Sequence, residues 1–305
     1  MVSLSDFLIL PTKDIARLVR AAGPQVCVFP NDGTRRWFML EHAKNVTGDL
    51  FAAYQVAGVH RHAELYRIFF DHGIDTLLAP IFGGETLKRG DDYMEKVALN
   101  GLLQFAENPE FIHLYDEYQV RVRFYGDYRK HLRGIPKAER IIEAFETIST
   151  RTRAHSRHRL LFGLFANNAT ETIAELAIQS FQETGTIPDY RKLVELYYGE
   201  YIEPANLYIG FEKFCAFDYP LLATGVEDLY FMVAPSSYLE EKQLRMILYD
   251  HLYTRRVDDP EYQSLSSEDR RWLKDFYTSN REVVLGTGVI KAGIWVPNSK
   301  LTLPD

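Results

Sequence analysis

Residues 26–38 read V-C-V-F-P-N-D-G-T-R-R-W-F. The first five are apolar and mostly β-forming, which is typical of a short buried strand. Asn31, Asp32 and Gly33 favour a tight turn, and a helix can begin at Thr34. The segment therefore predicts a strand, a turn and a helix. Free backbone N–H groups and the positive end of the helix dipole would lie above the turn.

Two arginines follow this turn. Arg35 and Arg36 carry permanent positive charge, and guanidinium groups are well suited to phosphate oxygens. With the amides of Gly33 and Thr34 they predict a diphosphate site, in which Asp32 could hold a metal ion or take a proton. An ordinary D-G turn followed by two solvated arginines is the alternative that the motif by itself leaves open.

The composition is that of a globular protein. The chain has 305 residues, of which 46% are apolar and 25% charged, enough to bury a core. A net charge of −7 argues against nucleic acid as the main partner. We expect no transmembrane segment, because no apolar run approaches ~20 residues, and the N-terminus has no secretory pattern. Cys27 and Cys215 lie far apart in apolar surroundings, so we expect buried free thiols and a cytoplasmic protein.

Apolar strands alternate with amphipathic helices over most of the chain. Strands are expected at 26–30, 75–82, 120–126, 159–166, 206–211 and 229–234. Helices are expected at 6–22 (interrupted at Pro11), 50–72, 92–106, 137–147, 169–183, 188–198, 217–224 and 238–254. This order predicts an α/β fold with a central, mostly parallel six-stranded sheet flanked by helices.

We expect one domain over residues 1–256, followed by a C-terminal extension over 257–305. The extension has a short helix near 268–277, and its end forms a hairpin or a contact surface. In parallel sheets, ligands bind beyond the carboxyl ends of the strands. The D-G-T-R-R loop and the G-G-E-T loop at 83–86 both lie at that edge, which favours the diphosphate site over a solvated turn.

Several segments, in order, resemble the cis-prenyltransferases of the undecaprenyl diphosphate synthase type. In that family the aspartate of a D-G-N-G-R-W loop binds the metal–diphosphate of an allylic substrate, and residues 32–37 here read D-G-T-R-R-W. The family segments F-S-x-E-N and r-V-x-G-D correspond to residues 82–86 and 123–127. The resemblance covers about residues 24–256.

The chain departs from the elongating members of that family at a second diphosphate site. Those members hold it with two arginines in R-T-S-G-E-x-R-L-S-N, and Gly210 and Ala216 fall at these positions. The segment at 166–172 also lacks the arginine of N-Y-G-G-R-x-E. Each lost charge-assisted hydrogen bond costs about 1.5–3 kcal/mol, so the first diphosphate site is kept and the second is absent.

A closer resemblance extends nearly end to end. The chain is similar to the bacterial diterpene synthases with a cis-prenyltransferase fold, the group of tuberculosinol/isotuberculosinol synthase (tuberculosinyladenosine transferase) and kolavelool synthase. The shared segments are F-P-x-D-G-T-R-R-W-F and those at 72–82, 124–128, 197–201 and 247–251, with G-I-W near the C-terminus.

This resemblance implies a homodimeric enzyme that ionises a bicyclic diterpenyl diphosphate with Mg²⁺ and quenches the allylic cation with water. The product would be a tertiary diterpene alcohol. The implied catalytic residues are Asp32, Tyr54 and Tyr93. The implied diphosphate-binding residues are Gly33, Thr34, Arg35 and Arg36, and Asp32 is the implied magnesium ligand.

The sequence also allows other roles for some of these residues and other functions for the protein. Periodicity by itself is equally compatible with core tyrosines at Tyr54 and Tyr93. His60 and His62, at i,i+2 spacing, are expected on different helix faces and not as a metal pair. A transferase that passes the cation to a nucleoside or another acceptor is an alternative function, as is a non-catalytic prenyltransferase-like subunit. Retention of Asp32 and both arginines argues against the latter.

Overall fold

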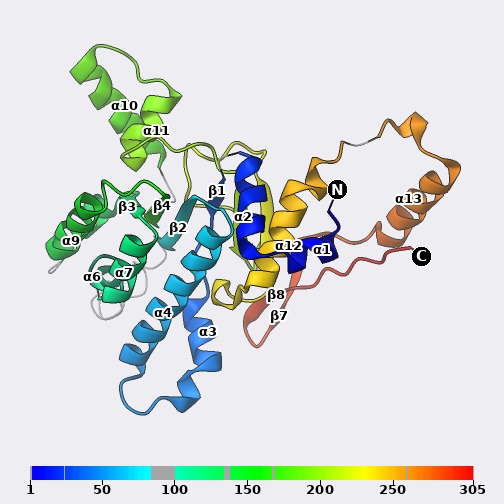
Figure 1. Cartoon of the computed structure of the whole chain (residues 1–305), viewed down its shortest axis with the longest axis horizontal. Coiled ribbons are helices and arrows are strands. Elements are labelled where there is room, and N and C mark those ends of the chain that lie inside the picture. Colours follow the sequence, from blue (N-terminus) through cyan, green and yellow to red (C-terminus); the bar gives the residue numbers. More distant parts are fainter. Residues whose placement is uncertain are drawn as a thin grey trace.

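The computed structural model describes residues 2–23, 25–83, 100–133, 138–166, 169–258 and 260–304, and it is built around one six-stranded sheet (Figure 1). The strands are β1 (Val26–Val28), β2 (Thr76–Phe82), β3 (Val120–Tyr125), β4 (His158–Leu164), β5 (Leu207–Phe211) and β6 (Asp228–Met232). Their order is β3-β4-β2-β1-β5-β6, and every pairing is parallel. The predicted α/β fold with a parallel sheet is confirmed.

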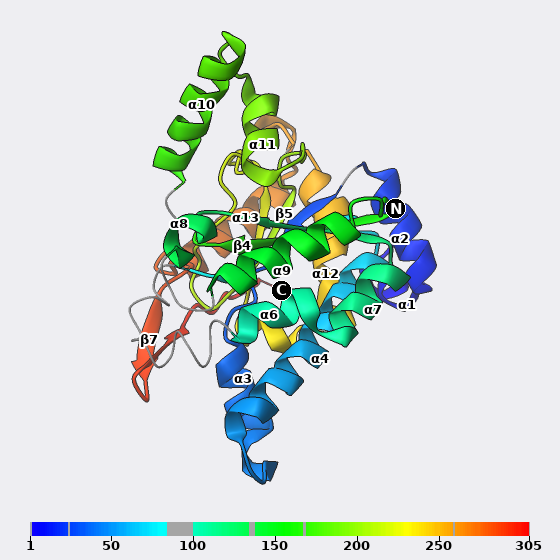
Figure 2. The ribbon, with the colours of Figure 1, turned by 90° about the vertical axis from the view of Figure 1, so that its left-hand side faces the viewer.

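Helices precede, separate and follow these strands. They are α1 (Leu4–Ile9), α2 (Thr12–Ala21), α3 (Thr34–Glu41), α4 (Leu50–Asp71), α6 (Asn100–Glu107), α7 (Pro109–Glu117), α8 (Tyr128–Leu132), α9 (Ala138–Arg151), α10 (Thr170–Thr184), α11 (Tyr190–Tyr198) and α12 (Glu241–Leu252). The predicted interruption at Pro11 is confirmed, because this residue separates α1 from α2. In both views α10 and α11 project at one end of the molecule and α3 at the other (Figures 1 and 2).

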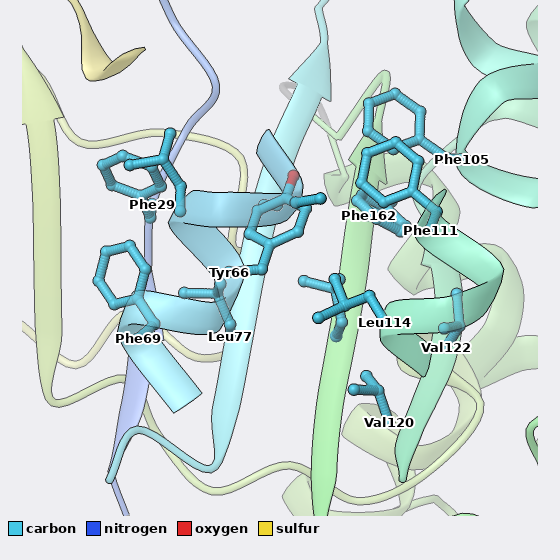
Figure 3. Packing of buried hydrophobic residues seen from close by; sticks show 14 of the residues in the cluster. Phe29, Tyr66, Phe69, Leu77, Phe105, Phe111, Leu114, Val120, Val122 and Phe162 are labelled. Atoms are coloured by element: carbon cyan, nitrogen blue, oxygen red, sulfur yellow. The ribbon is translucent and has the colours of Figure 1, made fainter. Parts of the chain in front are cut away.

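Successive residues of a strand point to opposite faces of the sheet, and a separate hydrophobic core covers each face. Cys27 of β1 belongs to the larger core, which α2, α4, α6, α7, α9 and α12 cover. Val26 and Val28 belong to the smaller core, covered by α11 and by the segment that follows β5. Figure 3 shows the aromatic side chains of the larger core, where the hydroxyl of Tyr66 points toward the carboxyl ends of the strands. A helix therefore brings a polar group to that edge from within an apolar core.

The helix predicted at 217–224 is wrong. Residues 212–227, here called the β5–β6 loop, contain turns, and Asp218 and Leu221 have φ angles of +63° and +66°. Such angles are incompatible with a right-handed helix. Tyrosine hydroxyls bind its backbone carbonyls instead: Tyr208 to Cys215 (3.2 Å), Tyr125 to Asp218 (2.7 Å), Tyr198 to Pro220 (2.7 Å) and Tyr190 to Leu221 (2.9 Å). Long-range side-chain bonds thus replace the helical ones.

The expectation of two buried thiols is half correct. Cys27 is buried in β1, and burial raises the pKa of its thiol. Cys215 is exposed, because it lies on the β5–β6 loop and not in the sheet.

The C-terminal segment contains α13 (Ser267–Asn280) and an antiparallel hairpin of β7 (Gly288–Lys291) and β8 (Ile294–Pro297) (Figure 1). This confirms the hairpin predicted near the end of the chain. The segment approaches the sheet domain at Gly286, where an added methyl group would come within 3.1 Å of the Phe214 ring. The boundary at residue 256 stays a prediction. None of the helices in the described part of the chain has the length and apolar composition of a membrane span.

Candidate active site

A cavity of about 590 Å³ opens at the carboxyl edge of the sheet. Its walls come from the loop after β1, the N-terminal half of α4, the end of β2, helix α6 and the β5–β6 loop. Strand β1 has β2 on one side and β5 on the other, so the cavity lies where the chain changes direction across the sheet. Ligands of open α/β sheets bind at this position, and the volume is within the ~300–1,000 Å³ of small-molecule sites.

The D-G turn can accept only glycine at its second position. Gly33 has a φ of +75°, and an added methyl group would come within 2.8 Å of Pro235 and 2.9 Å of Phe211. Helix α3 starts directly after it at Thr34, and no side chain in the described ranges caps that end. The first amides of α3 and the positive end of its dipole therefore lie at the cavity wall and are suited to an anion.

A buried serine fixes this turn from a distant part of the sequence. Ser236 follows β6; its N–H donates to the carbonyl of Asp32 (3.0 Å), and its hydroxyl donates to the carbonyl of Pro30 (2.8 Å). The same hydroxyl accepts from the N–H of Asp32 (3.2 Å). These bonds join the loop after β1 to the connection between β6 and α12.

The charged side chains of the turn lie near the cavity mouth. Arg36 donates to Glu212 (3.1 Å), and its guanidinium lies 5.3 Å from the centre of the Phe211 ring. Both contacts hold a cation beside the start of α3. Arg35 is exposed, as is Asp32, whose carboxylate accepts a hydrogen bond from the N–H of Gly33 (2.7 Å).

Helix α4 contributes Tyr54 and His62 to the cavity. Tyr54 is half-buried, and its ring meets Phe38 edge-on at 5.4 Å. The Nε2 atom of His62 lies 3.1 Å from the hydroxyl of Thr34. Burial, with a smaller contribution from Arg61, lowers the pKa of His62 to about 4, so the imidazole is neutral at pH 7. His60 is exposed and binds Glu110, which confirms that the two histidines face different directions.

Three residues that line the cavity each have a buried polar atom without a hydrogen-bond partner in the described part of the chain. These atoms are Oδ1 of Asn31, Nε2 of Gln55 and Oδ1 of Asp218. Burial raises the pKa of the Asp218 carboxyl to about 6. Unpaired buried polar atoms are rare in folded proteins, so these three side chains need an explanation beyond the packing of the chain. The sequence analysis did not name Gln55, Asp218 or Ser236. It treated Asn31 only as a turn residue and His62 only as a residue not expected to ligate a metal.

Six of the seven predicted site residues line this one cavity: Asp32, Gly33, Thr34, Arg35, Arg36 and Tyr54. Tyr93 and the end of the G-G-E-T loop lie outside the described residues. The roles assigned to these side chains stay predictions.

The residues present fit a magnesium ion supplied with the substrate. Within the described ranges no three His, Cys, Asp or Glu side chains are placed to hold a metal together. Asp32 offers one carboxylate at the cavity wall. Magnesium commonly takes one or two carboxylates and completes its shell with substrate oxygens and water.

The positions of the missing arginines are also informative. At Gly210 in β5 an added methyl group would come within 2.8 Å of the rings of Phe231 and Tyr208. Ala216 lies on the exposed part of the β5–β6 loop. Aromatic packing therefore fills the space around the first position, so a larger side chain cannot be restored there without rearrangement.

Solved structures identify the fold class. Lavandulyl diphosphate synthase from Lavandula x intermedia, in complex with dimethylallyl diphosphate, has a TM-score of 0.60 at 15% identity and covers 75% of this chain and 95% of that one. A probable undecaprenyl diphosphate synthase from Campylobacter jejuni has a TM-score of 0.52 at 16% identity, with 77% and 96% covered. The chain has the cis-prenyltransferase fold.

Sequence relatives narrow this class to a family. The chain is 40% identical over 296 residues to tuberculosinyl adenosine transferase of Mycobacterium tuberculosis (strain CDC 1551 / Oshkosh), covering 97% of this chain and 98% of the relative. It is 25% identical over 307 residues to (+)-kolavelool synthase of Herpetosiphon aurantiacus, covering 97% and 96%. No protein-family model matches the chain. The chain belongs to the family of tuberculosinyl adenosine transferase.

Proposed function

We propose that this protein cleaves a diterpenyl diphosphate, of the tuberculosinyl or kolavenyl type, and passes the diterpenyl group to an acceptor. One observation carries the proposal: the amides and arginines at the start of α3 share a single cavity with an apolar, aromatic wall. The diphosphate binds at Gly33–Arg36. The hydrocarbon lies against Ile81, Phe82 and Phe105, which line the other part of the cavity.

The reaction begins when the bond between the allylic carbon and the diphosphate oxygen breaks. Its electron pair leaves with the diphosphate. Arg35, Arg36 and the helix amides stabilise the charge that develops on the leaving group, a contribution of roughly 2.7–4 kcal/mol per strong donor. Magnesium, held by Asp32 and diphosphate oxygens, would neutralise part of that charge. Tyr54 and Tyr93 stabilise the cation through their ring faces or donate hydrogen bonds to the leaving group.

Two acceptors have specific support. Transfer to a nucleoside is favoured by the 40% identity to tuberculosinyl adenosine transferase over nearly the whole chain. It is also favoured by the polar residues that line the cavity, such as Gln55 and Asp218, because a polar acceptor would pair with polar side chains. Capture by water, with Asp32 as the base that takes its proton, is favoured by the relative named (+)-kolavelool synthase. The larger identity makes the nucleoside our first candidate.

Diphosphate release and product analysis test this function. The protein is incubated with Mg²⁺ and geranylgeranyl, kolavenyl or tuberculosinyl diphosphate, with and without adenosine. We expect release from a bicyclic substrate, with either an adenosine adduct or a tertiary alcohol as product. Absence of release from all three substrates would overturn the proposal. Chain elongation after addition of isopentenyl diphosphate would contradict the inference from Gly210 and Ala216.

We further propose that the protein is a homodimer, as its resemblance to the cis-prenyltransferases implies, and that the extension over 257–305 is a contact surface. Exposed apolar side chains on the extension support this, among them Trp272, Tyr277 and Ile290. Light scattering of the full chain measures the mass in solution. A monomer would contradict the proposal.

A further inference from the structure

Asp218 lines the cavity, and the reaction proposed above gives its carboxylate no role. It lies in the β5–β6 loop with Phe217, and both residues line the cavity wall. The backbone at Asp218 is fixed, since its φ is +63° and its carbonyl accepts a hydrogen bond from the hydroxyl of Tyr125 (2.7 Å). Further tyrosine hydroxyls hold the loop on both sides of it. Asp218 therefore lies in the cavity wall, on a loop whose backbone is restrained.

One oxygen of this carboxylate lacks a hydrogen-bond partner, and no ion pair compensates its charge in the described part of the chain. Its Oδ1 atom is buried without a hydrogen-bond partner, and no described lysine, arginine or histidine forms an ion pair with it. Burial of an unpaired carboxylate costs free energy. A structural role does not explain such a cost, because the loop is already held through its backbone carbonyls. A ligand that offers a hydrogen-bond donor would explain it.

The surroundings of Asp218 define which ligand can bind. A second diphosphate is excluded, because the arginines that would hold it are replaced by Gly210 and Ala216 and because a carboxylate repels phosphate. A neutral group with an N–H donor is attracted. The neighbouring Phe217 ring is partly exposed and lines the same cavity, which suits stacking with a planar base. The two features together favour an amino-substituted heteroaromatic base.

We propose that Asp218 and Phe217 form the acceptor subsite, where the base of a nucleoside stacks on Phe217 and donates an N–H hydrogen bond to Asp218. This inference rests on the proposed function. As the allylic carbon–oxygen bond breaks, its electron pair leaves with the diphosphate. A nitrogen lone pair of the base forms the new bond to carbon, and the N–H proton passes to Asp218. Charge and atoms balance without another reactant.

The test compares the wild type with Asp218→Asn and with Glu203→Gln, using Mg²⁺, tuberculosinyl diphosphate and adenosine. Asparagine has the shape of aspartate but cannot take the proton. Glu203 is exposed, lies outside the cavity lining and binds Tyr201, so it is the control for loss of a negative charge. Diphosphate release and adenosine adduct are measured separately, with the KM for each substrate. Thermal unfolding establishes that each variant is folded.

We expect Asp218→Asn to form the adduct about 100-fold more slowly, the lower range of a lost general base. Its KM for adenosine should rise, while diphosphate release continues and water takes a larger share of the cation. Glu203→Gln should behave as wild type. The acceptor subsite would be overturned if Asp218→Asn forms the adduct as fast as the wild type. It would also be overturned if the variant loses diphosphate release to the same extent as adduct formation. If the wild type makes only the alcohol in the presence of adenosine, the acceptor subsite is also overturned. Diphosphate release in that experiment would still support the proposed function.

Discussion

Two aspartates only ten residues apart in the sequence, at opposite edges of the sheet, have opposite surroundings. Asp228 begins β6 at the amino edge, where it accepts hydrogen bonds from His251 (2.6 Å) and Arg256 (2.9 Å) and pairs with Arg255 (3.4 Å). Asp218, at the carboxyl edge, has a buried oxygen atom with no partner in the described ranges. The first carboxylate joins α12 and the turn after it to the sheet. The second is the carboxylate for which we propose a ligand as partner.

This contrast separates structural from functional motifs in the family resemblance. The I-L-Y-D-H segment at 247–251 supplies His251 to Asp228 and Asp250 to Tyr230, so it holds the amino edge together. The D-G-T-R-R segment has its amides and charges at the carboxyl edge instead. Resemblance of sequence does not distinguish the two, whereas their positions at opposite edges of the sheet do.

The largest expected effect is on stability at the amino edge. Asp228→Ala removes one partner from a buried pair and leaves His251, Arg255 and Arg256 without their shared anion. We expect the free energy of unfolding to fall by about 3–5 kcal/mol, measured by urea unfolding, while diphosphate release per folded molecule is unchanged. Glu203→Ala, at an exposed position, should cost less than about 0.5 kcal/mol. If Asp228→Ala and Glu203→Ala are equally stable, Asp228 does not have the stabilising role that distinguishes it from Asp218.

The next effect is on turnover. Asp32→Asn removes the carboxylate that would hold magnesium or take the proton, so kcat should fall about 100-fold or more. The thermal midpoint should stay at its wild-type value, because Asp32 is exposed and its backbone bonds to Ser236 persist. Steady-state kinetics and calorimetry measure the two quantities. Retained turnover would mean that another residue performs this chemistry.

The substitution Asp218→Asn is expected to have a smaller effect of opposite sign, because it should stabilise the folded protein. Its folded pKa of about 6 lies above the ordinary value of 3.8, so the folded state binds more protons between these pH values. The wild type therefore loses stability relative to Asp218→Asn as pH rises from 3.8 to about 6, and the difference is constant above that range. At pH 8 we expect the variant to be more stable by about 2 kcal/mol. Chemical unfolding across this pH range measures the difference, and a less stable variant would contradict the unpaired state of Asp218.

The smallest effect concerns the serine that fixes the D-G turn. Ser236→Ala removes the hydroxyl bonds to Pro30 and Asp32 and should cost about 1 kcal/mol of stability. The KM for the diphosphate substrate should rise severalfold, because the amides of α3 lose their fixed position. Ser237→Ala removes only a 3.4 Å contact to Thr34 and serves as the matched control. A KM that changes equally in both variants would count against this role of Ser236.

The sequence predicted those parts of the molecule that depend on neighbouring residues. Strands such as β2 were recognised because their apolar runs are short and bounded by turn residues. The turn and the start of a helix at 32–36 are predictable because the turn residues and the helix start are contiguous in the sequence. The role of this segment in diphosphate binding stays a prediction.

What the sequence did not reveal depends on contacts between distant residues. The segment at 217–224 has an apolar pattern compatible with a helix, but tyrosines on β3 and α11 hold it as a loop. Ser236 reaches Asp32 across 204 residues. Asp218 gave no signal in the sequence, because its lack of a partner is a property of the folded chain.

The most direct test of the central claim is a crystal structure with a non-hydrolysable diterpenyl diphosphate analogue. We predict that both phosphate groups lie within hydrogen-bond distance of the amides of Thr34–Arg36 and of the Arg36 guanidinium, with the hydrocarbon along the aromatic wall of the cavity. An analogue whose phosphorus atoms lie far from Asp32 and Arg36 would contradict it.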